Sequence, residues 1–271
     1  MHLLKGFSAL TGMFAHRHLM KQMLIRSISL RYKGSFLGLF WTIVQPLLML
    51  FVYSFVFGVI FQPRWAEVGS YGILSYPLFI FSGLSIFNIF AECVNGSTPL
   101  IIHNTNYVKK VVFPLELLPL NQVFVSFIFG SVWLILLLAG VFFVAGRLNW
   151  CMLFLIIPLV SLFLFSLGLS YFFSSICVFL RDTQYFLSIV VQVLSFVTPI
   201  FFPLSVVPEK YQWVLLCNPL AHIVEYVRGI TLNSVVPSWD YSLLLILISF
   251  AFFYLGLAWF MATKKGFADV L

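Results

Sequence analysis

The sequence predicts an all-α polytopic membrane protein, with six transmembrane helices in one domain that covers residues 1–271. Three observations predict this class. First, 62% of the residues are hydrophobic, which is more than a soluble chain of this length could bury. Second, only 8% are charged, whereas a soluble domain carries about 25%. Third, the charges divide the chain into six long uncharged runs. Together these features exclude soluble enzymes and soluble nucleic-acid-binding proteins.

The first element is the N-terminal segment, residues 1–33, which we expect on the cytoplasmic side. It holds six Lys and Arg residues, and it lacks both the continuous apolar core and the small-residue cleavage site of a signal peptide. When about residues 10–33 are drawn as a helix, the apolar side chains cluster loosely, although Arg26 lies beside them. We therefore expect an amphipathic helix at the membrane interface.

The uncharged runs that follow hold 23 to 33 residues each. A helix needs about 20 residues to cross about 30 Å of hydrocarbon, and it satisfies its backbone hydrogen bonds internally. The predicted spans are approximately 36–61, 73–94, 118–145, 151–180, 184–206 and 241–262. Six spans place both ends on one side, where 11 of the 15 Lys and Arg residues also fall. Because positive charge marks cytoplasmic loops, we expect both termini in the cytoplasm.

Two links between spans are long enough to form structure of their own. Residues 95–116, after the second span, hold short apolar pieces broken by Pro99 and Pro114, which suits a short helix on the cytoplasmic surface. Residues 203–240, between the fifth and sixth spans, are too polar to span and too apolar for a free loop. We expect a re-entrant or periplasmic helical hairpin there, broken at Asn218 and the proline after it.

The chain lacks the motifs of an ATP-binding or hydrolytic site. No GxxxxGK[ST] phosphate loop, HExxH helix or GxSxG turn occurs. Glu92 is nearly the only ionisable residue in a span, whereas ion-coupled transporters and intramembrane enzymes need such groups. The four cysteines have no metal-like spacing and are interpreted as small hydrophobes. We therefore expect no catalytic residue, metal or cofactor in this chain, and an energy source outside it.

The first and fifth spans hold residues that disturb a helix. Gln45 and Pro46 lie inside the first span, and Gln192, Thr198 and Pro199 lie inside the fifth. A proline kinks a helix, and a buried glutamine needs a polar partner or water. These spans are therefore expected to line a pathway. Their aromatic rings suit sugars, whose apolar faces stack on rings, but they equally suit lipid contact with Trp and Tyr at the interface.

Four segments carry a resemblance to a known family. They are RYKGSFLGLFWTIVQPLLMLFVYSFVFG (31–58), NTNYVKKVVFPLELLPL (104–120), FLRDTQYFLSIVVQVLSFVTPIFFP (179–203) and NPLAHIVEYVRGI (218–230). Together they resemble the membrane subunit of a type-2 ABC exporter, in the branch that exports O-antigen, capsular polysaccharide or teichoic acid. The resemblance implies a homodimer in the bacterial inner membrane with two copies of a separate ATPase, which binds ATP and Mg²⁺. It also implies a polysaccharide substrate on an undecaprenyl-diphosphate-type lipid, and no nucleic acid.

The resemblance also implies roles for particular residues. The predicted ATPase-coupling segment comprises Asn104, Thr105, Asn106, Tyr107, Val108, Lys109 and Lys110. The predicted cytoplasmic pyrophosphate contacts are Arg31, Lys33, Lys109 and Lys110. The predicted channel lining comprises Trp41, Gln45, Phe51, Tyr53, Phe55, Tyr185, Gln192, Phe196 and Thr198. The predicted periplasmic gate includes Trp213, Asn218, Pro219, Glu225 and Arg228.

Other interpretations stay open at this point. The cations at the cytoplasmic side serve equally well as topological anchors or contacts to anionic lipids. A teichoic-acid, lipid or drug exporter is the nearest alternative function. A polytopic glycosyl- or acyltransferase is disfavoured because the spans carry no catalytic Asp and His sets, and a passive channel or scaffold is a third class.

Overall fold

The computed structural model describes residues 16–61, 75–109, 113–146 and 149–271, and this part of the chain holds helices and no strand. The α-helices are α2 (Arg17–Arg31), α3 (Trp41–Phe55), α4 (Ser75–Ser97), α5 (Leu100–His103), α6 (Thr105–Lys109), α7 (Leu117–Ala145), α8 (Ile156–Phe179), α9 (Thr183–Val197), α10 (Glu209–Leu216), α11 (Pro219–Thr231), α12 (Trp239–Thr263) and α13 (Phe267–Val270). Short 3₁₀ segments occur at Gly38–Phe40, Trp150–Leu155, Leu204–Val206 and Lys264–Gly266, and a π-helix follows α3 at Val56–Phe61.

Five helical segments are long and apolar enough to cross a membrane. They are Gly38–Phe55, Tyr76–Ser97, Leu117–Ala145, Trp150–Phe179 and Trp239–Val270. These segments coincide with the first four predicted spans and with the sixth. The chain is therefore an all-α membrane protein within its described residues, as the hydrophobic runs predict.

The fifth predicted span is shorter than expected. α9 holds 15 residues, which corresponds to about 22 Å of helix and is less than the roughly 30 Å of a hydrocarbon core. The helix ends at Val197, and Thr198 is extended with φ −86° and ψ 134°. Pro199 explains this end, because a proline disfavours helical geometry in the residue before it. The helix expected over 184–206 thus stops at Val197.

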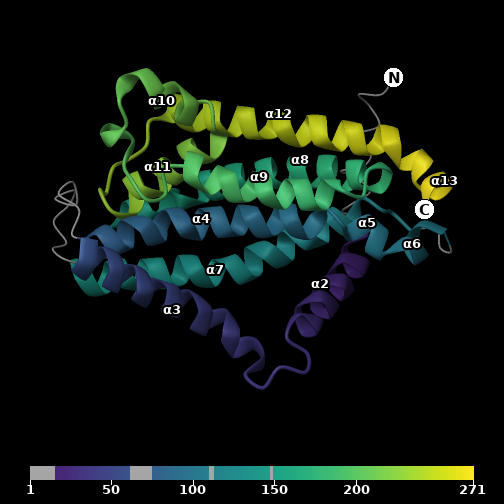
Figure 1. Cartoon of the computed structure of the whole chain (residues 1–271), viewed down its shortest axis with the longest axis horizontal. Coiled ribbons are helices and arrows are strands. Elements are labelled where there is room, and N and C mark those ends of the chain that lie inside the picture. Colours follow the sequence, from purple (N-terminus) through teal and green to yellow (C-terminus); the bar gives the residue numbers. More distant parts are fainter. Residues whose placement is uncertain (1–15, 62–74, 110–112, 147–148) are drawn as a thin grey trace.

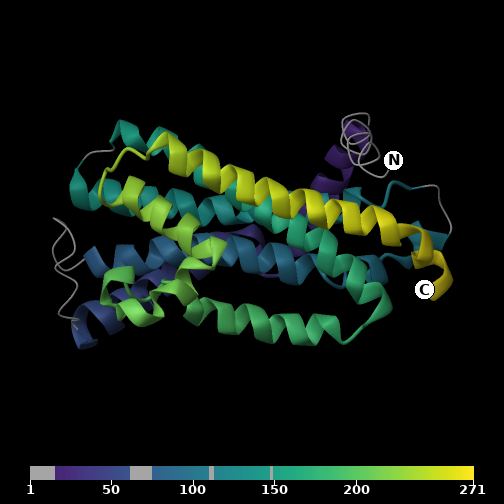
Figure 2. The ribbon, with the colours of Figure 1, turned by 90° about the horizontal axis from the view of Figure 1, so that it is seen from above.

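The long helices run side by side along the length of the molecule (Figures 1 and 2). α4 lies in the middle and is 83% buried over its apolar window, whereas α3 is only 6% buried. α8 and α12 pack backbone to backbone, because a Cβ on Gly256 would lie 2.0 Å from the carbonyl oxygen of Gly168. Such contact needs small residues, which are common where membrane helices approach closely.

The two ends of the bundle hold different elements. α5, α6 and α13 lie at one end, and α10 and α11 lie at the other (Figure 1). The hairpin α10–α11 begins a new helix at Pro219, where the Asn218 side chain accepts a hydrogen bond from the backbone N–H of Leu220. Asparagine before a proline is a favoured helix start. Two helices broken at Asn218 are thus present between α9 and α12.

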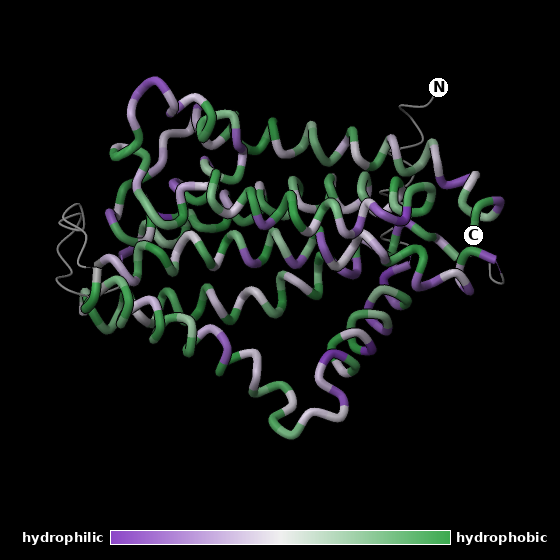
Figure 3. The backbone as a smooth tube through the Cα atoms, viewed as in Figure 1, coloured by the Kyte–Doolittle hydropathy of each residue, from purple (hydrophilic) through white to green (hydrophobic). Residues whose placement is uncertain are grey.

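The N-terminal segment contains a helix, α2, which leaves the bundle at an angle (Figure 1). Its partly buried side chains Leu19, Met20 and Met23 pack against the core, while Ile25 and Leu30 are exposed. Figure 3 shows hydrophobic residues along the long helices and hydrophilic residues mixed into α2. The helix is confirmed, and its place at a membrane interface stays a prediction.

Candidate functional site

A cavity of about 430 Å³ lies between α3, α4 and α7, beside the end of α2. Polar and aromatic side chains share its wall. The lining residues are Arg31, Tyr32, Thr42, Gln45, Met49, Tyr53, Leu84, Asn88, Ala91, Glu92, Asn95, Gly96, Phe129 and Trp133. The cavity thus joins one predicted pyrophosphate contact, Arg31, with two predicted channel residues, Gln45 and Tyr53.

One face of α4 supplies most of the polar wall. Asn88, Glu92 and Asn95 recur at spacings of four and three, which places side chains on one face of a helix. Their partial exposure contrasts with the rest of α4, whose apolar side chains form the middle of the core. Asn88, Glu92 and Asn95 therefore form a polar stripe on α4 that faces the cavity, although most of this helix is buried.

Arg31 is held at the edge of this cavity by two contacts. Its guanidinium donates a hydrogen bond to Glu92 and forms an ion pair with it. The guanidinium carbon also lies 4.0 Å from the centroid of the Phe129 ring, which attracts a cation through its π face. Burial lowers the pKa of Arg31, but Glu92 and Tyr32 outweigh this effect and raise it. The charge of Arg31 is therefore permanent and is matched within the chain.

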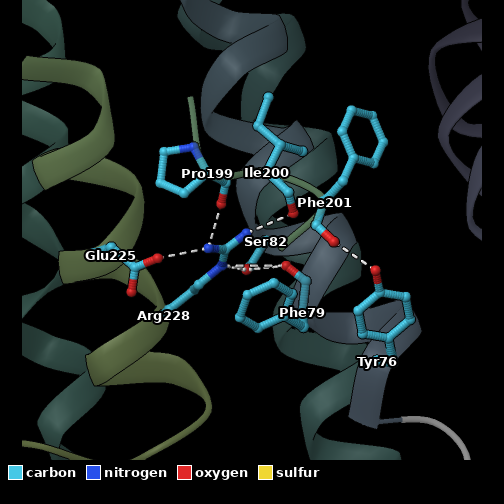
Figure 4. A network of polar contacts seen from close by, with 8 residues as sticks. All are labelled: Tyr76, Phe79, Ser82, Pro199, Ile200, Phe201, Glu225 and Arg228. Atoms are coloured by element: carbon cyan, nitrogen blue, oxygen red, sulfur yellow. Dashed lines mark hydrogen bonds and ion pairs between the residues drawn. The ribbon is translucent and has the colours of Figure 1, made fainter. Parts of the chain in front are cut away.

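A second polar network surrounds Arg228 on α11 (Figure 4). This side chain is 2% exposed. Its N–H groups donate to the carbonyl oxygens of Pro199, at 2.5 Å, and Ile200, at 2.7 Å. Further contacts reach the α4 residues Phe79, at its carbonyl, and Ser82, at its hydroxyl. Arg228 therefore joins α11, the broken segment after α9, and α4.

Charge and shape support this position of Arg228. Its ion pair to Glu225 measures 2.7 Å, and its guanidinium carbon lies 3.6 Å from the centroid of the Phe79 ring. Desolvation by burial lowers the pKa of Arg228 to about 10, while the charge of Glu225 acts in the opposite direction. The guanidinium therefore stays protonated at neutral pH. Gly83 leaves room for it, because a Cβ there would lie 2.8 Å from a guanidinium nitrogen.

Neighbouring contacts fix the same segment on both sides. The Asn218 amide donates to the Thr198 hydroxyl at 2.9 Å. Figure 4 shows the other contact, in which the Tyr76 hydroxyl donates to the Phe201 carbonyl at 2.5 Å. The carbonyls that the break at Pro199 frees from a helix are thus taken up by Arg228 and its surroundings, as buried backbone groups require.

A third group of contacts joins α2 to the link after α4. Arg26 donates to the Tyr107 hydroxyl at 3.4 Å, and Asn121 on α7 donates to the Ser27 hydroxyl at 3.0 Å. The ring of Tyr107 stacks on Phe113 with centroids 4.6 Å apart. A cavity of about 330 Å³ separates α2 from α5 and α6. The N-terminal helix and the predicted coupling segment therefore touch at Arg26 and Tyr107 and share the walls of this cavity.

Comparison with known proteins decides the family. The family model described as ABC-2 type transporter matches residues 18–232. The chain belongs to the ABC-2 type transporter family. A relative from Klebsiella pneumoniae, the O-antigen export system permease protein RfbA, is 30% identical over 250 residues and covers 91% of this chain and 92% of the relative.

More distant relatives of this ABC-2 permease carry similar names. The O-antigen export system permease protein RfbA of Myxococcus xanthus is 26% identical over 260 residues, 95% of this chain and 96% of the relative. The polysialic acid transport protein KpsM of Escherichia coli is 27% identical over 238 residues, 85% of this chain and 86% of the relative. The chain thus aligns with transport permeases along nearly their whole length.

The predicted channel residues of the permease lie mostly on exposed faces of α3 and α9. Phe51, Tyr185 and Phe196 are 68%, 67% and 65% exposed on the single chain. Trp41, Gln45, Phe55 and Gln192 are also exposed, and Tyr53 is half-buried. Thr198 differs, because it is fully buried and its hydroxyl is engaged by Asn218. Thr198 therefore holds the hairpin and does not face open space in this chain.

The other predicted residues of the permease fall in three places. Residues 104–109 lie in and just before α6, with Asn106 and Lys109 exposed, and Lys110 lies outside the described residues. Lys33 is exposed beyond the end of α2. At the opposite end Trp213 is 64% exposed on α10. Asn218 and Arg228 are buried within the hairpin's contacts.

Several residues of these sites escaped prediction. Asn88, Asn95, Phe129 and Trp133 in the cavity were not expected, nor was the anchoring of Arg228 by α4. The spacing of Asn88, Glu92 and Asn95 on one helical face was an available signal in the sequence. Within the described residues, no group of three or more His, Cys, Asp or Glu side chains could hold a metal.

Proposed function

We propose that this permease exports O-antigen or capsular polysaccharide, linked to an undecaprenyl-diphosphate-type lipid, across the bacterial inner membrane. The observation that carries the proposal is the alignment of 91% of the chain with an O-antigen export permease at 30% identity. A cavity lined by polar and aromatic side chains within the membrane bundle is consistent with it. Teichoic acid is the runner-up substrate.

The proposed assembly is a homodimer with six spans in each subunit, in which α9 and the segment after it form the fifth. The exposed aromatic faces of α3 and α9 support this, because they would be covered or would enclose a channel in a dimer. Both termini are proposed to be cytoplasmic, which places α5, α6 and α13 on that side and α10 and α11 on the periplasmic side.

A separate ATPase subunit, two copies per dimer, is proposed to supply the energy and to bind ATP and Mg²⁺. Its docking surface would be formed by α2, α5 and α6, which meet at Arg26 and Tyr107. Lys33 and Lys109 are the proposed contacts for the lipid pyrophosphate, since both are exposed cations beside this surface. The hairpin α10–α11, with Trp213 exposed, is the proposed periplasmic gate.

Deletion and complementation of the reading frame in its host test this function. We expect surface polysaccharide to disappear while lipid-linked polymer accumulates inside the cell, and the intact chain to restore export. If the lipid-linked polymer is never made, the chain acts in synthesis, as a membrane glycosyltransferase would. If only teichoic acid is lost, the runner-up substrate is correct. If all surface glycans stay unchanged, the proposed function is wrong.

A further inference from the structure

We infer that the cavity between α3, α4 and α7 binds a neutral pyranose ring of the exported glycan. This inference rests on the proposed function and adds to it the place and the chemical class of one contact. The cavity volume of about 430 Å³ falls in the range of about 300–1,000 Å³ that holds small ligands. Its charge, its hydrogen-bonding groups and its rings each define the ligand.

The charge of the cavity argues for a neutral ligand. Its lining includes one cationic residue, Arg31, and one anionic residue, Glu92, and these two form an ion pair. The two side chains are 31% and 29% exposed. Both charged groups therefore stand at the cavity wall, where a ligand would meet them together. A phosphate at this guanidinium would lie beside the Glu92 carboxylate, which already pairs with Nη1 of Arg31, and the carboxylate would repel it. The Arg31 cation is therefore already matched, and an anion gains little here.

The hydrogen-bonding groups are free to take a ligand. The amides of Gln45, Asn88 and Asn95 line the cavity, and none bonds to another side chain or backbone group in the described part of the chain. The Thr42 hydroxyl is buried and has no partner among the described residues. Each amide offers two donors and one acceptor oxygen, and a buried hydroxyl without a partner is costly. Adjacent sugar hydroxyls both donate and accept, so they satisfy this set.

Aromatic rings provide the apolar side of the same wall. Trp133 lines the cavity and is fixed from behind by Phe81, with ring centroids 5.4 Å apart in a stacked arrangement. Tyr53 is fixed by Phe57 at 6.1 Å. Fixed rings beside amides suit a pyranose, which has one apolar face of C–H groups and a rim of hydroxyls. A lipid tail would leave the amides unpaired, and a phosphate would leave the rings unused.

Binding to the purified permease tests this assignment. The protein is placed in lipid nanodiscs, because sugar-headed detergents would occupy the cavity, and saturation-transfer NMR is recorded with methyl pyranosides of glucose, galactose, mannose and N-acetylglucosamine. We expect transfer to the ring C–H protons of at least one of them. Asn88→Leu should weaken that binding about 3- to 10-fold, the effect of one lost hydrogen bond, and Asn233→Leu should not, since Asn233 is exposed outside the cavity.

A second variant and a competition experiment distinguish the possible outcomes. Gln45→Leu, on the less buried α3, repeats the test if Asn88→Leu fails to fold. Absence of transfer to all four pyranosides, or equal binding by the wild type and both cavity variants, overturns the inference. Displacement of the bound pyranoside by inorganic pyrophosphate, lost in Arg31→Gln, would instead make this a phosphate site. If pyranosides fail to bind while the chain still exports polysaccharide in cells, the inference falls and the proposed function stands.

Discussion

Arg228→Met should destabilise the permease strongly, because methionine fills the space and removes every polar contact. The substitution leaves the buried carbonyls of Pro199 and Ile200 without their donor and separates Glu225 from its cation. Each of the two orphaned buried acceptors costs about 1–3 kcal/mol, and loss of the ion pair adds only about 0–1 kcal/mol, because the Glu225 side chain is 38% exposed. These costs overlap in one network, so we expect about 3–5 kcal/mol in total.

Thermal unfolding of the purified permease, followed by tryptophan fluorescence, measures the effect. A loss of about 3–5 kcal/mol corresponds to a Tm lower by roughly 6–20 °C for a chain of this size. Arg181→Met is the matched control, because Arg181 is exposed after α8, and its Tm should stay within about 2 °C of the wild type. Arg228→Lys should be intermediate, since lysine keeps the charge but lacks the planar fork. If Arg228→Met unfolds within about 2 °C of Arg181→Met, the network does not hold the hairpin.

Three more outcomes follow from the same structure. Gly256→Ala should lower the Tm by several degrees, since its Cβ would meet the α8 backbone at 2.0 Å, whereas Gly229→Ala, with nothing within 4 Å, should keep or raise it. Tyr107→Ala should weaken the joint between α2 and α6 and reduce ATPase co-purification several-fold while the Tm stays near the wild type. Phe196→Ala, at a residue 65% exposed, should leave the Tm unchanged and shorten or reduce surface polysaccharide; unchanged polysaccharide would count against an aromatic channel wall.

The helices were predictable because each depends on a local property. An uncharged apolar run longer than about 20 residues forms a helix in lipid whatever its neighbours are, and five such runs do so here. The predicted end of the fifth span is wrong, because the hydrophobic run continues through Pro199 whereas the helix ends at Val197. The proline was visible in the sequence, but the tolerance of membrane helices for proline left two outcomes open.

The sites were less predictable because their partners lie far apart in the chain. The phosphate contact of Arg31 stays a prediction, but its ion pair with Glu92, 61 residues later, could not be inferred from the local sequence. Thr198 was expected to face the pathway, and it is buried against Asn218. A polar residue beside a broken helix can either line a channel or form hydrogen bonds that stabilise the end of the helix. The packing of α11 decides between these two roles for Thr198.

The contrast between α4 and α3 shows which helix links the two ends of the permease. Near one end of α4, Glu92 holds α2 through Arg31, and near the other end Phe79 and Ser82 hold α11 through Arg228. The 13 residue-to-residue steps from Phe79 to Glu92 correspond to about 20 Å of continuous helix, and α4 is the most buried of the five long apolar segments. A displacement of α2 therefore acts on the same helix that anchors the hairpin, whereas α3, with nine of its 15 residues exposed, contributes no polar contact to either network within the described residues.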